Sequence, residues 1–225
     1  MAAVTVGLLV LLALLSWAEA SGSAFQRVDA AVLNWVLAHR AGWVTPTARA
    51  VTDSGASALL FPLVGLAGLA VRRHTGRWAP GAAAVVVVVV GVMSRLGLSR
   101  LVRDPRPPRG DWLVSVSGFS FPSGHAATST LVAGALAWLL ACAVQARGAR
   151  TILMLMCAIW AVLVSLSRVY LGVHWISDII GSWLLAGAWL TALCATRWHV
   201  LLPRPPHGSA PRGKRTSTHA LRPRP

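Results

Sequence analysis

Two histidines, an aspartate and several arginines gather in three short polar segments of an otherwise apolar chain. The segments are SRLVRDPRPPR (residues 99–109), FPSGH (121–125) and SRVYLGVHWISD (167–178). A histidine can attack phosphorus or transfer a proton, and the planar guanidinium group of arginine suits phosphate oxygens. These residue types favour phosphoryl transfer, provided that the fold brings the three segments together.

The third segment pairs a histidine with a carboxylate. His174 and Asp178 are four residues apart, so near the start of a helix the carboxylate can accept a hydrogen bond from one imidazole nitrogen. That bond fixes the tautomer and leaves the other nitrogen free to attack. Arg168 lies six residues before His174, and Gly172 between them lets the chain turn back toward the same point.

The other two segments add an anion site and a second histidine. Ser123 and Gly124 offer backbone N–H groups where a helix is predicted to begin, at the positive end of its dipole. His125 then lies in the first turn, where it can donate a proton to a leaving oxygen. Arg106 lies between two prolines in the first segment, with Arg100 nearby.

Each segment also has a plainer interpretation. The arginines could be interfacial anchors, PSGH could be only a turn before a helix, and a histidine near an interface could be a polar residue with ordinary partners. Ionisable groups at membrane depth usually pair or take part in function. The occurrence of all three segments on one side of the predicted bundle therefore favours a site.

The rest of the chain has the composition of a membrane protein. Of its 225 residues, 56% are hydrophobic and 12% are charged, and the mean hydropathy is +0.64. Six apolar segments approach the roughly 20 residues that a membrane-spanning helix needs. They cover residues 3–17, 58–71, 80–98, 124–144, 152–166 and 175–195. We predict an all-α integral membrane bundle of about six transmembrane helices, with an interfacial amphipathic helix after the first.

The basic residues predict the orientation of this bundle. The net charge of +15 comes from residues between and after apolar runs, with no basic stripe interleaved with aromatic residues, which argues against nucleic-acid binding. Two connectors (arginines at 72, 73 and 77, and at 147 and 150) and the basic C-terminal tail fall on one side, predicted to be cytoplasmic. The three polar segments then lie on the extracytoplasmic face of the cell membrane.

The chain divides into four predicted parts. Residues 1–20 form a first transmembrane helix or a signal-like segment, and the absence of a basic start favours a retained helix. Residues 21–57 form an extracytoplasmic amphipathic segment, with a plain packed connector as the alternative. Residues 58–200 form the catalytic membrane core, and 201–225 form a basic, Pro/Arg-rich cytoplasmic tail expected to be disordered.

The order of the motifs resembles the type 2 phosphatidic acid phosphatase family. The matching motifs are RP (106–107), PSGH (122–125) and SR-x5-H-x3-D (167–178). Membrane members of this family include lipid phosphate phosphatases and polyprenyl diphosphate phosphatases. The resemblance implies that His174 forms a phosphohistidine, that Asp178 orients it and that His125 is the general acid. It also implies no metal or other cofactor, and phosphate binding by the following residues: Arg106, Ser123, Gly124 and Arg168.

One position departs from the family pattern. The first motif usually has a lysine seven residues before the RP arginine, and here that position is Ser99. Arg100 is one residue further on and Arg95 is one helical turn earlier on the same face, so either could reach into the gap. We assign Arg100 as an additional phosphate ligand.

Three functions fit these motifs. The first is a membrane phosphatase acting on a lipid phosphate or polyprenyl diphosphate. The second is a membrane protein that binds lipid phosphates without turnover, and the third is a serine hydrolase using Ser123, although the G-x-S-x-G motif is incomplete. The sequence favours the first without identifying the lipid, because phosphatidic acid, phosphatidylglycerol phosphate and polyprenyl diphosphates share similar phosphorus chemistry.

Overall fold

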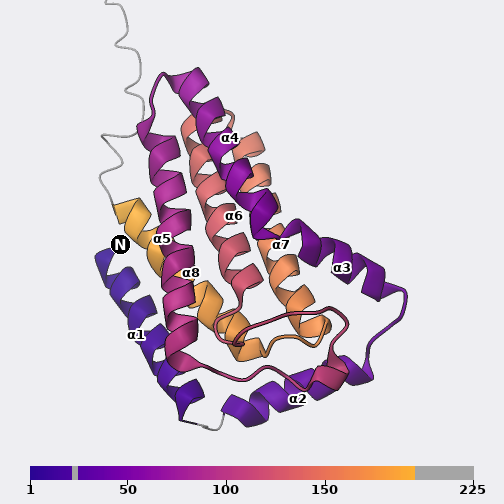
Figure 1. Ribbon diagram of the computed structural model, residues 1–225. Coiled ribbons are helices and arrows are strands. Elements are labelled where there is room, and N and C mark those ends of the chain that lie inside the picture. The colour runs from indigo at the N-terminus through magenta and orange to yellow at the C-terminus, as the bar shows by residue number, and fades with distance from the viewer. Residues whose placement is uncertain (22–24, 196–225) are drawn as a thin grey trace, which may run out of the picture.

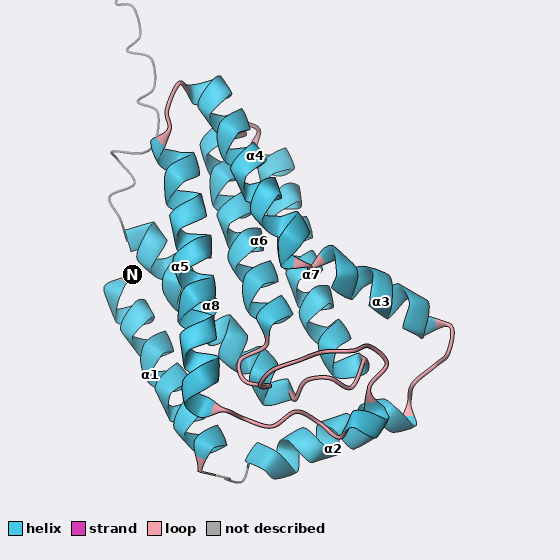
Figure 2. Cartoon of the chain, viewed as in Figure 1, coloured by secondary structure: helices cyan, strands magenta, loops and turns pink. Residues whose placement is uncertain are grey.

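The fold is entirely helical across the described part of the chain. The computed structural model describes residues 1–21 and 25–195, and within these ranges it contains eight α-helices, one short 3-10 helix and no strand (Figure 2). The helices are α1 (Ala2–Ala20), α2 (Phe25–Ala38), α3 (Val44–Ser54), α4 (Ser57–Thr75), α5 (Ala79–Val102), α6 (Gly124–Ala143), α7 (Arg147–Tyr170) and α8 (Ile176–Ala195). The predicted all-α class is confirmed, whereas the predicted tail lies outside the described residues.

The lengths and compositions of these helices give five candidate membrane spans, or six if one bent pair of helices counts as a single span. Among the described residues, α1, α5, α6, α7 and α8 are each long and apolar enough to cross a membrane. Helices α3 and α4 pass the same test when they are taken together as one span, which is bent by 51° between them. The short predicted segments 58–71 and 152–166 form the apolar cores of longer helices, because α4 and α7 both continue into the polar residues that flank them.

Helix α6 lies at the centre of the bundle, surrounded by α4, α5, α7 and α8 (Figure 1). Its buried face includes Leu131 and Leu139, which share one apolar core with Val64 of α4 and Val88 of α5. Small residues bring the neighbouring helices close together. A Cβ atom added to Gly68 of α4 would lie 2.9 Å from the Cα atom of Gly81 in α5, so these two backbones touch.

The first helix packs along the last one. The hydroxyl oxygens of Thr5 and Thr191 are 2.9 Å apart, and Leu12 and Leu15 of α1 pack in one cluster with Leu185 of α8. These contacts are those expected of a helix that stays in the bundle. They support a retained first helix, which remains a prediction.

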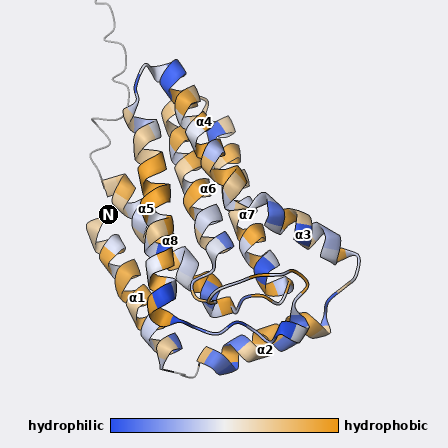
Figure 3. Ribbon diagram, viewed as in Figure 1, coloured by the Kyte–Doolittle hydropathy of each residue, from blue (hydrophilic) through white to orange (hydrophobic). Residues whose placement is uncertain are grey.

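The predicted amphipathic helix is α2, which lies across the end of the bundle (Figure 1). Its outer face leaves Phe25, Val28 and Trp35 exposed, as suits a helix at a membrane surface. Its inner face buries Asp29 and Leu33 against the bundle. The loops 103–123 and 171–175 occupy the same end, where blue, hydrophilic stretches alternate with orange, hydrophobic ones (Figure 3).

Candidate active site

His174 lies in the turn between α7 and α8, two residues before α8 begins. Gly172 shapes this turn with a φ of +75°, and an added Cβ atom there would lie 2.3 Å from the backbone oxygen of Asp111. The Nδ1 atom of His174 is 3.0 Å from Oδ2 of Asp178, so the predicted pair forms although His174 precedes the helix. Because a carboxylate accepts hydrogen bonds, the proton lies on Nδ1 and the lone pair on Nε2.

A single carboxylate oxygen of Asp178 organises this corner of the site. Besides His174, Oδ2 accepts hydrogen bonds from the backbone N–H of Trp175 at 2.8 Å and from the Ser120 hydroxyl at 2.5 Å. Both Ser120 and Asp178 are fully buried. The orientation of His174 is therefore fixed by α8 and by the loop that precedes α6.

The other nitrogen of His174 faces an arginine. Nη1 of Arg106 is 3.0 Å from Nε2 of His174, and since a guanidinium group can only donate, Nε2 accepts this bond. Arg106 is held in place by backbone carbonyls, among them those of Gly118 and Val173. Burial lowers the pKa of His174 well below its usual range, and the positive charges of Arg106 and Arg168 lower it further. His174 is thus neutral at pH 7, with its lone pair directed at the proposed phosphate site.

Arg168 enters from the last turn of α7. Its side chain is buried, and Nη1 donates a 2.8 Å hydrogen bond to the hydroxyl of Thr52 in α3. Its Nε atom is buried without a partner among the described residues. The arginine predicted to bind phosphate therefore keeps an unused donor, and α3 helps to position it.

The start of α6 differs in one respect from the prediction. Ser123 is the N-cap residue, and its backbone N–H donates to the carbonyl oxygen of Asp178 at 3.3 Å. This N–H is therefore not available to a phosphate, because α8 already uses it. Within residues 1–21 and 25–195, the N–H groups of Gly124 and His125 form no such bond, and they are the free donors at the dipole end of α6.

His125 completes the constellation from the first turn of α6. Its ring is half-buried and makes no hydrogen bond to any described residue. It lies within electrostatic range of His174, Arg168 and Arg106. The three polar segments thus meet around one point, as the sequence predicted.

The two candidates for the missing lysine occupy different places. Nε of Arg95 donates a 2.8 Å hydrogen bond to the carbonyl oxygen of Pro122, and its Cζ atom would lie 3.4 Å from a Cβ atom added to Gly124. Arg95 therefore faces the start of α6 directly. Arg100, assigned from the sequence, is exposed and touches neither histidine. The sequence signal for Arg95 was its helical spacing from Ser99.

Two further residues support the site and were missed by sequence reasoning. Asp29 of α2 accepts hydrogen bonds from Ser177, at 3.0 Å from the backbone N–H and 2.6 Å from the hydroxyl, at the start of α8. The sequence feature that could have revealed Asp29 is its position as an acidic residue on the apolar face of a predicted helix. Ser120 gave no signal, because its contact with Asp178 spans 58 residues of sequence.

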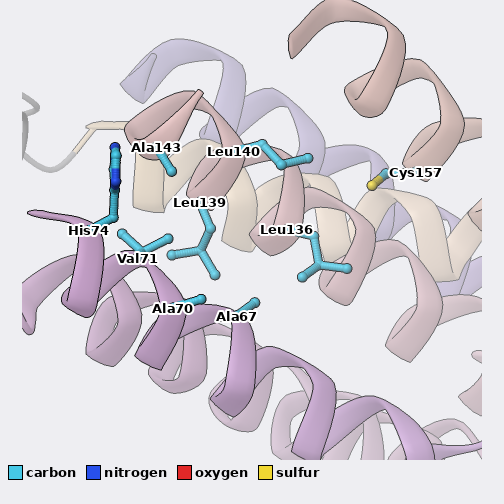
Figure 4. Close-up of a pocket in the computed structure, with 9 residues that line it drawn as sticks. All are labelled: Ala67, Ala70, Val71, His74, Leu136, Leu139, Leu140, Ala143 and Cys157. Atoms are coloured by element: carbon cyan, nitrogen blue, oxygen red, sulfur yellow. The ribbon is translucent and has the colours of Figure 1, made fainter. Parts of the chain in front are cut away.

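Among the described residues, neither a metal-binding cluster nor the apolar cavity beside α4 adds to this chemistry. No cluster of three or more His, Cys, Asp or Glu side chains within residues 1–21 and 25–195 is arranged to hold a metal ion. A cavity of about 520 Å³ between α4 and α6 is lined by apolar residues such as Leu136 and Leu139, with His74 at one end (Figure 4). It lies far along these helices from the histidines of the site.

Comparison with known proteins shows the family of the chain. The sequence profile described as PAP2 superfamily matches residues 80–202. The chain belongs to the PAP2 superfamily. It is 29% identical over 164 residues to phosphatidylglycerophosphatase B of Bacillus subtilis (72% of this chain, 80% of the relative). It is 33% identical over 126 residues to an undecaprenyl-diphosphatase of Sulfolobus acidocaldarius (48% of each chain).

Two solved structures share the fold. The crystal structure of a transmembrane PAP2-type phosphatidylglycerolphosphate phosphatase from Bacillus subtilis superposes with a TM-score of 0.80 at 26% identity, covering 89% of this chain and 98% of that one. LpxE of Aquifex aeolicus has a TM-score of 0.60 at 18% identity, covering 74% and 95%, which shows the fold alone. The predicted class, a multi-pass membrane lipid phosphatase, is confirmed.

Proposed function

We propose that this PAP2 protein releases the terminal phosphate of a lipid phosphate or lipid diphosphate through a phosphohistidine at His174. The observation that carries the proposal is the buried, neutral imidazole, held by Asp178 through Nδ1 with Nε2 turned toward Arg106. A neutral imidazole with a fixed tautomer is a competent nucleophile toward phosphorus.

In the first step Nε2 of His174 attacks phosphorus in line with the leaving oxygen. The bond from phosphorus to that oxygen breaks, and His125 donates its proton to the departing lipid alcohol or lipid monophosphate. Arg106, which now caps Nε2, turns its guanidinium group onto the phosphate oxygens as the substrate enters. Asp178 stabilises the positive charge that develops on the imidazole.

In the second step a water molecule replaces His174 on phosphorus. His125, now neutral, accepts a proton from the water, the bond between Nε2 and phosphorus breaks, and inorganic phosphate leaves. His174 regains its lone pair and His125 its proton, so the site is restored. Arg106, Arg168 and the free N–H groups of Gly124 and His125 stabilise the charge on phosphate in both steps.

We further propose that the site lies on the extracytoplasmic side of the cell membrane. The arginines at 72, 73 and 77, and those at 147 and 150, lie at the ends of α4, α5 and α7 away from the histidines. Basic connectors of this kind favour the cytoplasm. The lipid chain can then remain in the bilayer while the phosphate enters the site near the outer headgroups.

Phosphate release from a panel of lipid phosphates tests this function. Purified protein in detergent, assayed with a chelator present, should release phosphate, and a ³²P-labelled substrate quenched in alkali should leave label on the wild-type chain. His174→Ala should lose both signals, because a methyl group cannot attack phosphorus. Full turnover by His174→Ala would refute the assignment. Tight lipid binding without release from any substrate would favour the non-catalytic alternative.

A further inference from the structure

A second cavity adjoins the proposed phosphate site. It has a volume of about 320 Å³ and lies between the last turns of α5 and the segment 117–119. Its lining includes Arg95, Ser99, Arg100, Ser117 and Gly118. None of the lining residues is acidic.

Two side chains connect this cavity to the reacting histidine. Arg95 lines the cavity and also faces Gly124 at the start of α6, within 3.4 Å of its added Cβ position. On the other side, the carbonyl oxygen of Gly118 accepts a 3.0 Å hydrogen bond from Nε of Arg106, whose Nη1 atom is 3.0 Å from His174. The cavity is therefore one guanidinium group away from the nucleophile.

The chemistry of the lining suits an anion. Arg95 uses only Nε in hydrogen bonding, and the side chains of Arg100 and Ser99 make no hydrogen bond to any other described residue. Two guanidinium groups and a hydroxyl thus present unused donors to one space. Ser99 matters for size as well, because its short side chain leaves room that a longer one would fill.

We propose that this cavity binds a second phosphate group, the one that remains on the leaving group. The inference rests on the proposed function and specifies its substrate class, namely lipids that carry a phosphate beyond the one removed. In a prenyl diphosphate the second phosphate is joined directly through the bridging oxygen. In phosphatidylglycerol phosphate it lies across a glycerol unit, whereas phosphatidic acid has none. Arg95, between the two sites, stabilises the charge that forms on the departing phosphate.

Matched substrates test this inference with the intact protein. Farnesyl diphosphate and farnesyl monophosphate share one prenyl chain and differ by a single phosphate, and phosphatidylglycerol phosphate and phosphatidic acid provide a second comparison. For the wild type, kcat/KM should be at least about tenfold higher for the two-phosphate member of a pair, as expected for one added charge-assisted contact. The two pairs also show whether the cavity binds a second phosphate that is joined directly to the first, as in a diphosphate, or one that lies across a glycerol unit.

Variants then test whether the preference for the two-phosphate substrate arises in this cavity. Ser99→Leu fills the cavity without changing its charge, and Arg95→Gln removes one guanidinium group, so each should reduce the preference about tenfold. Arg109→Gln removes the same charge from the same face, but its side chain lies over Trp112 outside the cavity, and it should leave the preference unchanged. Gel-filtration profiles in detergent confirm that each variant is folded.

The outcomes separate the inference from the function on which it rests. Phosphate release at equal kcat/KM within both pairs, or a preference that Ser99→Leu and Arg95→Gln leave unchanged, would overturn the second-phosphate site and keep the phosphatase. No release by the wild type from any of the four lipids would overturn the proposed function itself.

Discussion

At the scale of single residues, the site depends on side chains whose hydrogen bonds leave one atom free. His174 is bonded through Nδ1, so Nε2 is left for chemistry, and Arg168 is bonded through Nη1, so Nε remains unused. The sequence indicated both residues through their motifs. It could not indicate Ser120, because nothing local connects this serine to Asp178.

Ser120→Ala should slow the reaction more than it weakens substrate binding. The change removes a short hydrogen bond to the carboxylate that orients His174, and a bond to a charged group contributes about 1.5–3 kcal/mol. We expect kcat to fall about tenfold with little change in KM, measured from initial rates of phosphate release. Ser120→Thr, which keeps the hydroxyl, should recover most of the rate. A raised KM at unchanged kcat would contradict a role in orientation.

His174 should stay neutral through mildly acidic conditions. Because burial and the neighbouring arginines lower its pKa well below 6.5, protonation requires a pH below the range in which an ordinary histidine titrates. Histidine NMR titration in detergent should show one resonance, absent in His174→Ala, that does not shift between pH 8 and 6. In Arg106→Gln, which removes the nearest positive charge, this resonance should begin to shift at a higher pH. A wild-type midpoint near 6.5 would disprove the assignment.

At the scale of elements, six apolar segments were predictable because their lengths and hydropathy are local properties. The roles of α2 and α3 were not, since they depend on tertiary contacts. The amphipathic pattern of α2 was recognised, yet its acidic residue is used to hold the start of α8. Likewise, Thr52 of α3 meets Arg168 across 116 residues of sequence.

Asp29→Ala should loosen the start of α8, next to the proposed catalytic pair His174 and Asp178. The substitution leaves the N–H and hydroxyl of Ser177 without their acceptor, and loss of a comparable cap costs about 1–2 kcal/mol. We expect a lower melting temperature in detergent together with a reduced kcat. Asp29→Asn retains an acceptor oxygen and serves as the matched control. If Asp29→Ala behaves like wild type in both assays, the contact between α2 and α8 is not important.

At the scale of the whole molecule, most of the acidic residues gather near the site end, whereas the exposed connectors at the other end are basic. Glu19, Asp29 and Asp104 line one cavity of about 190 Å³ between α1, α2 and the loop after α5. Burial raises the pKa of Asp104 from 3.8 to about 8, with repulsion from Asp178 adding to the effect. The folded protein thus holds a proton there that the unfolded chain releases above about pH 4.

The contribution of Asp104 to the stability of the protein should therefore fall as pH rises from about 4 to 8. Over this range the folded state binds more protons at Asp104 than the unfolded state does, so raising the pH favours unfolding. Asp104→Asn keeps a neutral polar side chain and should flatten this dependence, with a higher melting temperature at pH 8. Melting curves in detergent at several pH values provide the measurement. A wild type that grows more stable toward pH 8, with no difference from Asp104→Asn, would contradict the prediction.

The proposed orientation can be checked in intact cells. With the native cysteines replaced by alanine, Ser115→Cys near the site and Arg73→Cys at the opposite end both place a thiol at an exposed position. A membrane-impermeant maleimide should label Ser115→Cys in intact cells, but label Arg73→Cys only after the cells are permeabilised. The reverse pattern would place the site in the cytoplasm.

Two arginines of the site end also bear on how the chain is inserted into the membrane. Arg95 and Arg168 belong to two mainly apolar spans, and an unpaired guanidinium group in hydrocarbon is costly. The partner of Arg95 is a carbonyl just before α6, and the partner of Arg168 lies in α3. Neither span acquires its polar partner until other helices are in place. We therefore expect α5 and α7 to enter the lipid late in biogenesis, together with the segments that supply hydrogen-bond acceptors to Arg95 and Arg168. Assembly of the site and integration of the bundle into the membrane then occur as one event.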